Sequence, residues 1–114
     1  MRINLPTADV IKVIADEVSP PSVGQLVCIL NNRAVAADKD ANLQAIGITK
    51  SIQNSDVYVQ LTGKYANTSI GSTFWLGTNG SLLNSPPLTG MVQEVAKRID
   101  DNTILIAIDN TVIL

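Results

Sequence analysis

Carboxylates are the side chains in this sequence that could most readily do chemistry, because a pair of acids can act as general acid and general base. Three such pairs occur: Asp16 with Glu17, Asp38 with Asp40, and Asp100 with Asp101. All three lie in or beside segments of turn-like composition, where acidic residues cap and solvate the backbone. Solvated loops are therefore a better interpretation of these pairs than a glycosidase-type acid and base.

Other catalytic and metal-binding arrangements are also missing from the sequence. It contains no histidine, which excludes Ser-His-Asp and Cys-His nucleophile systems and removes the commonest transition-metal ligand. Residues 38–42 begin like a calcium loop, but the sixth position is Leu43 rather than glycine and the twelfth is Thr49 rather than glutamate. We therefore expect a protein that is not an enzyme and that has no cofactor and no metal site.

Three aromatic residues could in principle bind a sugar. Trp75, together with Tyr58 and Tyr65, could form a platform for ring stacking. Trp75 stands between Phe74 and Leu76 in an apolar segment, however. A single tryptophan in that setting more often packs in a core or an interface, so a carbohydrate-binding module is the weaker hypothesis.

Composition indicates one small domain that binds other subunits. The 114 residues are 46% hydrophobic and only 16% charged, whereas roughly a quarter of the residues of an average protein are charged. A small monomer of this composition would expose much uncharged surface, and contact with other subunits is the simplest way to cover it. The formal net charge of −2 lacks the basic character expected of a nucleic-acid-binding protein.

The sequence contains a single cysteine. Cys28 lies in the apolar run 26–30, so we interpret it as a small buried core residue rather than a reactive thiol.

No segment reaches the ~20 continuous apolar residues of a membrane-spanning helix. Residues 1–6 also lack the basic region and apolar block of a secretory signal. We expect synthesis in a cytoplasm and no membrane partner.

The segment 73–83 organises the rest of the chain. Its first four residues are rich in β-branched and aromatic types, and Asn79-Gly80 supplies the two positive φ angles of a type I′ turn. A second short strand around 81–83 ends at Pro86-Pro87, which donate no backbone hydrogen bond. The sequence therefore predicts a sharp hairpin here.

The N-terminal part reads as an arm, residues 1–22, followed by a domain over residues 23–114. Val10, Ile11, Val13 and Ile14 form a short apolar strand, which proline-containing segments set off on both sides. Two interpretations remain open. The strand is either an edge strand of the same domain or part of an arm that crosses to a neighbouring subunit or another protein.

Further strands are predicted at 25–30, 33–36, 45–49 and 57–62, with turns or loops at 31–32, 37–42, 51–56 and 63–72. Gly47 suggests a bulge or a close backbone approach. The segment 91–99 also fits a short helix, but a strand is favoured because Val92 and Val95 are β-branched.

The last strands are predicted at 103–108 and 112–114. The first of these is apolar throughout and should be covered on both faces. The second ends on three large aliphatic residues, which suggests a strand held in the sheet or in a subunit seam. With no long amphipathic helix available for βαβ crossovers, the fold class is all-β, a compact antiparallel β-barrel or β-sandwich with an extended N-terminal arm.

From Gly24 onward, the order of these features resembles a module of bacteriophage virion proteins, found in head decoration (cement) proteins and in some tail-fibre or receptor-binding segments. The segments that carry the resemblance are Ala-Ile-Gly-Ile at 45–48, Val-Tyr-Val-Gln-Leu-Thr-Gly at 57–63, Phe-Trp-Leu-Gly-Thr-Asn-Gly-Ser-Leu at 74–82, Pro-Pro-Leu-Thr-Gly at 86–90, Val-Gln-Glu-Val-Ala at 92–96 and Thr-Ile-Leu-Ile-Ala-Ile at 103–108. They cover most of residues 24–108.

This resemblance implies a non-enzymatic decoration protein on the outer surface of the capsid, made in the host cytoplasm. It also implies a homotrimer that binds the major capsid protein of the same phage. A tail-fibre or baseplate module for host attachment is the alternative. As interface residues we expect apolar side chains of the arm, of the central hairpin and of the C-terminus: Ile3, Leu5, Val10, Ile11, Val13, Ile14, Trp75, Val112, Ile113 and Leu114.

Overall fold

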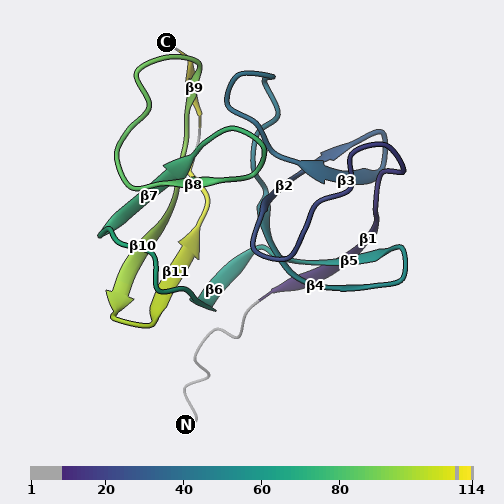
Figure 1. Ribbon diagram of the computed structural model, residues 1–114, viewed down its shortest axis with the longest axis horizontal. Coiled ribbons are helices and arrows are strands. Elements are labelled where there is room, and N and C mark those ends of the chain that lie inside the picture. Colours follow the sequence, from purple (N-terminus) through teal and green to yellow (C-terminus); the bar gives the residue numbers. More distant parts are fainter. Residues whose placement is uncertain (1–8, 110, 114) are drawn as a thin grey trace, which may run out of the picture.

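The computed structural model describes residues 9–109 and 111–113, and strands are the regular elements of these ranges (Figure 1). The predicted all-β fold is confirmed. Two five-stranded antiparallel sheets lie side by side, and a small two-stranded sheet lies near the C-terminal end of the chain. The chain fills the first sheet, then crosses once into the second.

The first sheet curls almost into a small barrel. Its strand order is β1-β5-β4-β2-β3, and its strands are β1 (Val10–Ile14), β2 (Leu26–Leu30), β3 (Arg33–Ala36), β4 (Gly47–Gln53) and β5 (Asp56–Gln60). The two ends of the sheet meet where Ala15, just after β1, forms a bridge with Ala34 of β3. There the Asp16 N–H donates to the Ala34 carbonyl at 3.0 Å. The curl encloses a small core of Val27, Ala34, Val57 and Val59.

The apolar N-terminal strand is an edge strand of this sheet. β1 pairs antiparallel with β5 along its whole length, from Val10 opposite Gln60 to Ile14 opposite Asp56. Of the two interpretations left open for this segment, the structure therefore shows the edge strand for residues 10–14. Residues 1–8 of the predicted arm lie outside the described residues.

The second sheet has the order β6-β11-β10-β7-β8. Its strands are β6 (Thr62–Ala66), β7 (Thr73–Leu76), β8 (Leu82–Leu83), β10 (Glu94–Asp100) and β11 (Thr103–Ala107), and the two-stranded sheet pairs β9 (Met91–Val92) with β12 (Val112–Ile113). A β-bulge interrupts β10 between Glu94 and Ala96. The prediction of a strand rather than a helix for 91–99 is confirmed, but the segment forms two strands, β9 and β10, that are separated at Gln93 and lie in different sheets.

The larger core lies between the two sheets. Phe74 and Leu76 point into it from β7, and Ile104 and Ile106 from β11, with exposed fractions of 1% or less. Burial of aliphatic or aromatic side chains of this size contributes about 1.5–3 kcal/mol each. The remaining members are Leu26, Ala37, Ala45, Ile48, Met91, Val95 and Ala96.

The hairpin predicted at Asn79-Gly80 is confirmed and joins the two sheets. Both residues have positive φ, 51° and 73°, as a type I′ turn requires. The Gly80 carbonyl accepts the N–H of Leu26 at 2.8 Å, so the turn packs on β2 of the first sheet. A Cβ on Gly80 would lie 2.8 Å from the Cβ of Gln25. Glycine is therefore needed here both for its φ angle and for its size.

Two segments differ from the prediction. β4 continues to Gln53, so the turn predicted at 51–56 shrinks to the two residues 54–55 between β4 and β5. Residues 63–66, predicted as part of a loop, belong to β6, which pairs with β11. The loop prediction failed because Gly63 and the polar neighbours give no alternating pattern, and the pairing comes from the tertiary context.

The prediction of two covered faces for the segment 103–108 is wrong. Ile104 and Ile106 are buried, but Leu105 is 39% exposed and Ala107 is also exposed. β11 is therefore covered on one face, with an apolar residue on the other. Gly47, by contrast, marks a close backbone approach as predicted, because a Cβ there would lie 2.4 Å from the Gln60 carbonyl oxygen.

Thr49 in β4 is fully buried, and its hydroxyl is the one buried side-chain polar atom without a hydrogen-bond partner among residues 9–109 and 111–113. An unpaired buried hydroxyl destabilises a fold by about 1–3 kcal/mol. Thr49→Val keeps the shape and removes this group. We expect the free energy of unfolding, measured with a denaturant, to stay unchanged or to rise by about 1 kcal/mol.

Thr62→Val, at an exposed position of β6, is the matched control for this substitution. Its effect should lie within about 0.5 kcal/mol of zero. A marked loss of stability in Thr49→Val alone would show that the buried hydroxyl has a partner.

Candidate interaction surface

One acidic side chain of each pair singled out in the sequence holds a turn. The Asp16 carboxylate accepts two backbone N–H groups, from residues 18 and 19, at 3.1 and 2.8 Å. The Asp100 carboxylate accepts the N–H of Asn102 at 2.9 Å. This bond, together with a bond from the side chain of Thr103, lowers the pKa of Asp100. Within the described ranges, no three His, Cys, Asp or Glu side chains could hold a metal ion together.

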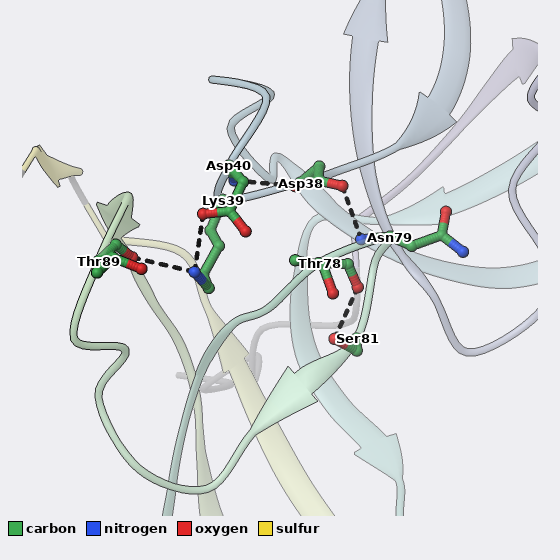
Figure 2. Close-up of polar contacts among 7 residues, drawn as sticks. All are labelled: Asp38, Lys39, Asp40, Thr78, Asn79, Ser81 and Thr89. Atoms are coloured by element: carbon green, nitrogen blue, oxygen red, sulfur yellow. Dashed lines mark hydrogen bonds and ion pairs between the residues drawn. The ribbon is translucent and has the colours of Figure 1, made fainter.

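The third acidic pair lies where three loops meet (Figure 2). Asp38 accepts the N–H of Asp40 at 2.8 Å with one oxygen and the N–H of Asn79 at 3.1 Å with the other. The Lys39 ammonium lies 2.9 Å from Asp40 Oδ1 and donates to the Thr89 carbonyl at 3.0 Å. These contacts tie the central hairpin and the loop 84–90 to the loop 37–43.

The loop 84–90 is fixed at both ends. The Lys39 carbonyl accepts the N–H of Met91 at 3.0 Å, and Asn84 at the other end donates to the Ile70 carbonyl at 3.1 Å. Between these anchors, Leu88 is 92% exposed. A large apolar side chain held out from an anchored loop is suited to contact a partner.

β1 carries most of the described residues that were predicted to lie in an interface. Val10, Ile11 and Ile14 are 38%, 37% and 50% exposed, whereas Val13 is half-buried against the small core. Exposed aliphatic residues thus occur on both faces of one edge strand. Ile3 and Leu5, predicted for the same interface, lie outside the described residues.

The backbone of β1 also has a free edge. Asp9 and Ala15 form their backbone hydrogen bonds on the β5 side. Because alternate residues of an antiparallel strand direct their backbone groups to opposite sides, those of Val10 and Lys12 point away from β5. The charge on Lys12 discourages uncontrolled pairing at this edge, and exposed apolar side chains flank it.

The other predicted interface residues lie elsewhere. Trp75 is half-buried on the outer face of the second sheet, opposite Leu83 of β8 and Glu94 of β10. Val112, which is 60% exposed, and Ile113 form β12 beside β9, and Leu114 lies outside the described residues. The structure thus places the predicted residues on three different elements rather than on one continuous patch.

Trp75 and Tyr65 do not share a platform. Trp75 lies on the outer face of the second sheet, whereas Tyr65 packs against the large core on the inner face. The Tyr65 hydroxyl donates to the Thr49 carbonyl at 3.2 Å, and burial raises the pKa of Tyr65. A sugar ring could not stack on both residues at once.

Cys28 has the surroundings of a structural residue. It is half-buried against the large core, and burial raises the pKa of its thiol. A raised pKa lowers the fraction of reactive thiolate at neutral pH. This agrees with the interpretation as an inert packing residue.

Several residues that shape the surface escaped the sequence analysis. Leu88 follows two prolines, a signal that predicted a break but not an anchored loop. Lys39 was assigned to a polar loop, and Leu105 was expected to be buried. The exposure of Leu105 depends on which face of β11 packs on the core, and no local pattern encodes that.

No family model matches the chain, and no curated protein matches its sequence. In the part of the chain that the structure describes, no helix is long and apolar enough to cross a membrane.

Proposed function

We propose that the chain is a structural protein of a bacteriophage particle, a capsid decoration (cement) protein that binds the assembled head and stabilises it. The proposal rests on the order of sequence segments from residue 24 onward and on one structural observation. That observation is β1, an edge strand with exposed aliphatic side chains on both faces, whose outer edge is unpaired by any other described strand except at its C-terminal end, where Ala15 bridges to β3. Its partners are the major capsid protein of the same phage and further copies of the chain, three in a homotrimer by resemblance.

The proposed mechanism is thermodynamic. A protein that binds the expanded shell and not its precursor shifts the equilibrium toward the expanded shell by its binding free energy. Several identical sites on one oligomer act together and raise the avidity well above that of a single site. Aliphatic residues on β1 supply apolar area for each contact. Each Å² of apolar area that is buried contributes about 25 cal/mol to the binding free energy.

A tail-fibre or baseplate module is the second candidate, and the loop 84–90 favours it. Leu88 is held outward on a loop anchored by Lys39 and Asn84, which suits contact with a receptor. The two candidates differ in where the protein lies on the particle. A catalytic role and a sugar-binding role receive no comparable support from the described residues.

Binding to heads tests the first candidate. DNA-free expanded heads of the encoding phage, prepared without this protein, are mixed with the purified chain and sedimented. The variant Val10→Thr with Ile14→Thr keeps β-branched residues in the strand and removes exposed apolar contact. We expect its affinity for heads to fall at least tenfold, since ~1.4 kcal/mol of lost contact is sufficient.

Val23→Thr with Ile52→Thr is the matched control, because both residues are exposed aliphatics away from β1, at 59% and 37% exposure. This control should bind heads within about twofold of the unmodified chain, as near-neutral contacts do. Failure of the unmodified chain to bind heads, or equal binding by the β1 variant, would contradict the proposal.

A further inference from the structure

Gly80, in the turn of the central hairpin, is fixed by both of its backbone groups. Its N–H donates to the Ala37 carbonyl at 2.5 Å, and its carbonyl accepts the N–H of Leu26 at 2.8 Å. A Cβ on Gly80 would lie 2.9 Å from the Leu26 carbonyl oxygen. The turn is therefore held tightly between β2 and the loop 37–43.

Asn79 is held by its backbone alone. Its N–H donates to Asp38 Oδ2 at 3.1 Å, and its carbonyl accepts the side-chain amide of Gln25 at 2.9 Å. Its own side-chain amide is exposed and forms no hydrogen bond with any residue in the described ranges. In Figure 2 this amide points away from the other side chains drawn. The amide carbon of Asn79 is thus accessible, whereas the backbone around it is fixed.

An asparagine followed by glycine can undergo deamidation. The Gly80 nitrogen, after losing its proton, would form a bond to Cγ of Asn79, and the bond from Cγ to the side-chain nitrogen would break, releasing ammonia. Water then opens the resulting succinimide ring to aspartate or to isoaspartate, in which the main chain contains one additional carbon. No other asparagine of the sequence precedes a glycine, the residue without a Cβ to hinder this attack.

We propose that Asn79-Gly80 is a deamidation site whose reaction is controlled by opening of the hairpin. Ring closure has to turn the Gly80 nitrogen away from the Ala37 carbonyl and toward Cγ of Asn79. This rotates the peptide group between the two residues, which breaks the bonds to Ala37 and to Gln25 together. A slow reaction that requires an open state proceeds at a rate set by the population of that state. The folded turn therefore protects the site.

The modified turn does not fit its place in the fold. Isoaspartate lengthens the main chain of a two-residue turn, and the space around Gly80 is already filled, since a Cβ there would lie 2.8 Å from the Cβ of Gln25. Because the hairpin contacts β2 of the first sheet, its loss weakens the connection between the two sheets. Deamidation thus marks chains whose hairpin has opened. This inference is independent of the proposed function, because it involves neither β1 nor a partner.

Peptide mapping by mass spectrometry tests the inference on the full chain. The chain is incubated in isotope-labelled water at mildly alkaline pH, folded or unfolded in urea, and hydrolysis of the succinimide places one solvent oxygen at position 79. In urea, Asn79 should react faster than the other asparagines. In the folded chain, its rate should be at least about tenfold lower, because the open state is a minor population. Equal rates in the folded and unfolded chain would overturn the inference.

Two substitutions open the hairpin without changing the reacting residues. Asp38→Ala removes the acceptor of the Asn79 N–H, and Gln25→Ala removes the donor to its carbonyl. Each should raise the rate at Asn79 in the folded chain by about fivefold and leave the rate in urea unchanged. Asp101→Ala, at an exposed position in the β10–β11 turn, is the control and should stay within about twofold of the unmodified chain.

Circular dichroism establishes that each variant is folded, and either of the two hairpin variants is sufficient if the other unfolds. The inference is wrong if the folded hairpin variants deamidate no faster than the control, or if another asparagine reacts first in urea.

Discussion

Replacing Gln93 with methionine is expected to lower the free energy of unfolding by about 3–5 kcal/mol. Gln93 is 2% exposed and lies between the two sheets. Its side-chain amide forms two hydrogen bonds with the backbone of Ala45, as a neighbouring strand would. Its oxygen accepts the Ala45 N–H at 2.9 Å, and its nitrogen donates to the Ala45 carbonyl at 3.0 Å. A third bond, to the Asp109 carbonyl at 3.1 Å, joins the segment that follows β11 to the same point.

Methionine has a similar volume but cannot form these bonds. The N–H and carbonyl of Ala45 would stay buried without their partner, and each such group costs about 1–3 kcal/mol. A loss of this size is a large part of the roughly 5–15 kcal/mol that stabilises a typical domain. The melting temperature should therefore fall by on the order of 10–20 °C.

Thermal and denaturant unfolding of Gln93→Met measure this effect. Gln53→Met, at an exposed position of β4, is the control and should change stability by less than about 0.5 kcal/mol. If both variants unfold like the unmodified chain, the amide of Gln93 does not hold the two sheets together.

Replacing Arg98 with methionine is expected to lower the free energy of unfolding by about 2–4 kcal/mol and to release the loop 67–72. The guanidinium donates to the Gly71 carbonyl at 2.8 Å and to the carbonyls of Asn67 and Asp100 at 3.0 Å. It also bonds to the Ser69 carbonyl. Its centre lies 5.4 Å from the centroid of the Phe74 ring, so it also covers one end of the large core.

Lysine at position 98 is not expected to restore the contacts of Arg98. One ammonium group has three donors on a single atom, whereas the planar guanidinium reaches acceptors in several directions at once. Arg98→Lys should therefore recover less than half of the lost stability. Hydrogen exchange of the amides at 67–72 should accelerate in both variants, because the loop loses its shared donor.

Arg33→Met provides the comparison for Arg98. Within the described ranges, Arg33 forms one hydrogen bond, a long one to the Ala15 carbonyl at 3.4 Å, and its replacement should cost less than about 1 kcal/mol. Equal losses for Arg33 and Arg98, with unchanged exchange in the loop, would show that the contacts of Arg98 contribute little.

The all-β fold and its hairpins were predictable because local chemistry specifies them. Asn79-Gly80 and Asn31-Asn32 adopt the positive φ angles that their residue types favour, and the alternating or β-branched segments form strands. β6 was not predictable, because Gly63 and Lys64 enter a strand only through pairing with β11. One-sided burial of β11 also escaped, since an apolar run does not show which of its faces meets the core.

The roles of Gln93 and Arg98 were hidden for a related reason. Gln93 stands between Val92 and Glu94 as an ordinary polar residue, and its burial follows from the position of Ala45 in another part of the chain. Arg98 reads as a surface charge until the loop 67–72 folds over it. In the candidate surface, the apolar residues of β1 indicated a strand that contacts another element. Whether that element was β5 of the same domain or another chain was left open.

Electron microscopy of the phage particle tests the central claim most directly. Particles made with and without this chain are reconstructed and compared. The account predicts density at three-fold positions of the outer head surface that disappears in particles lacking the chain, together with heads that break more easily when filled with DNA. Density on the tail, or identical heads in both preparations, would contradict it.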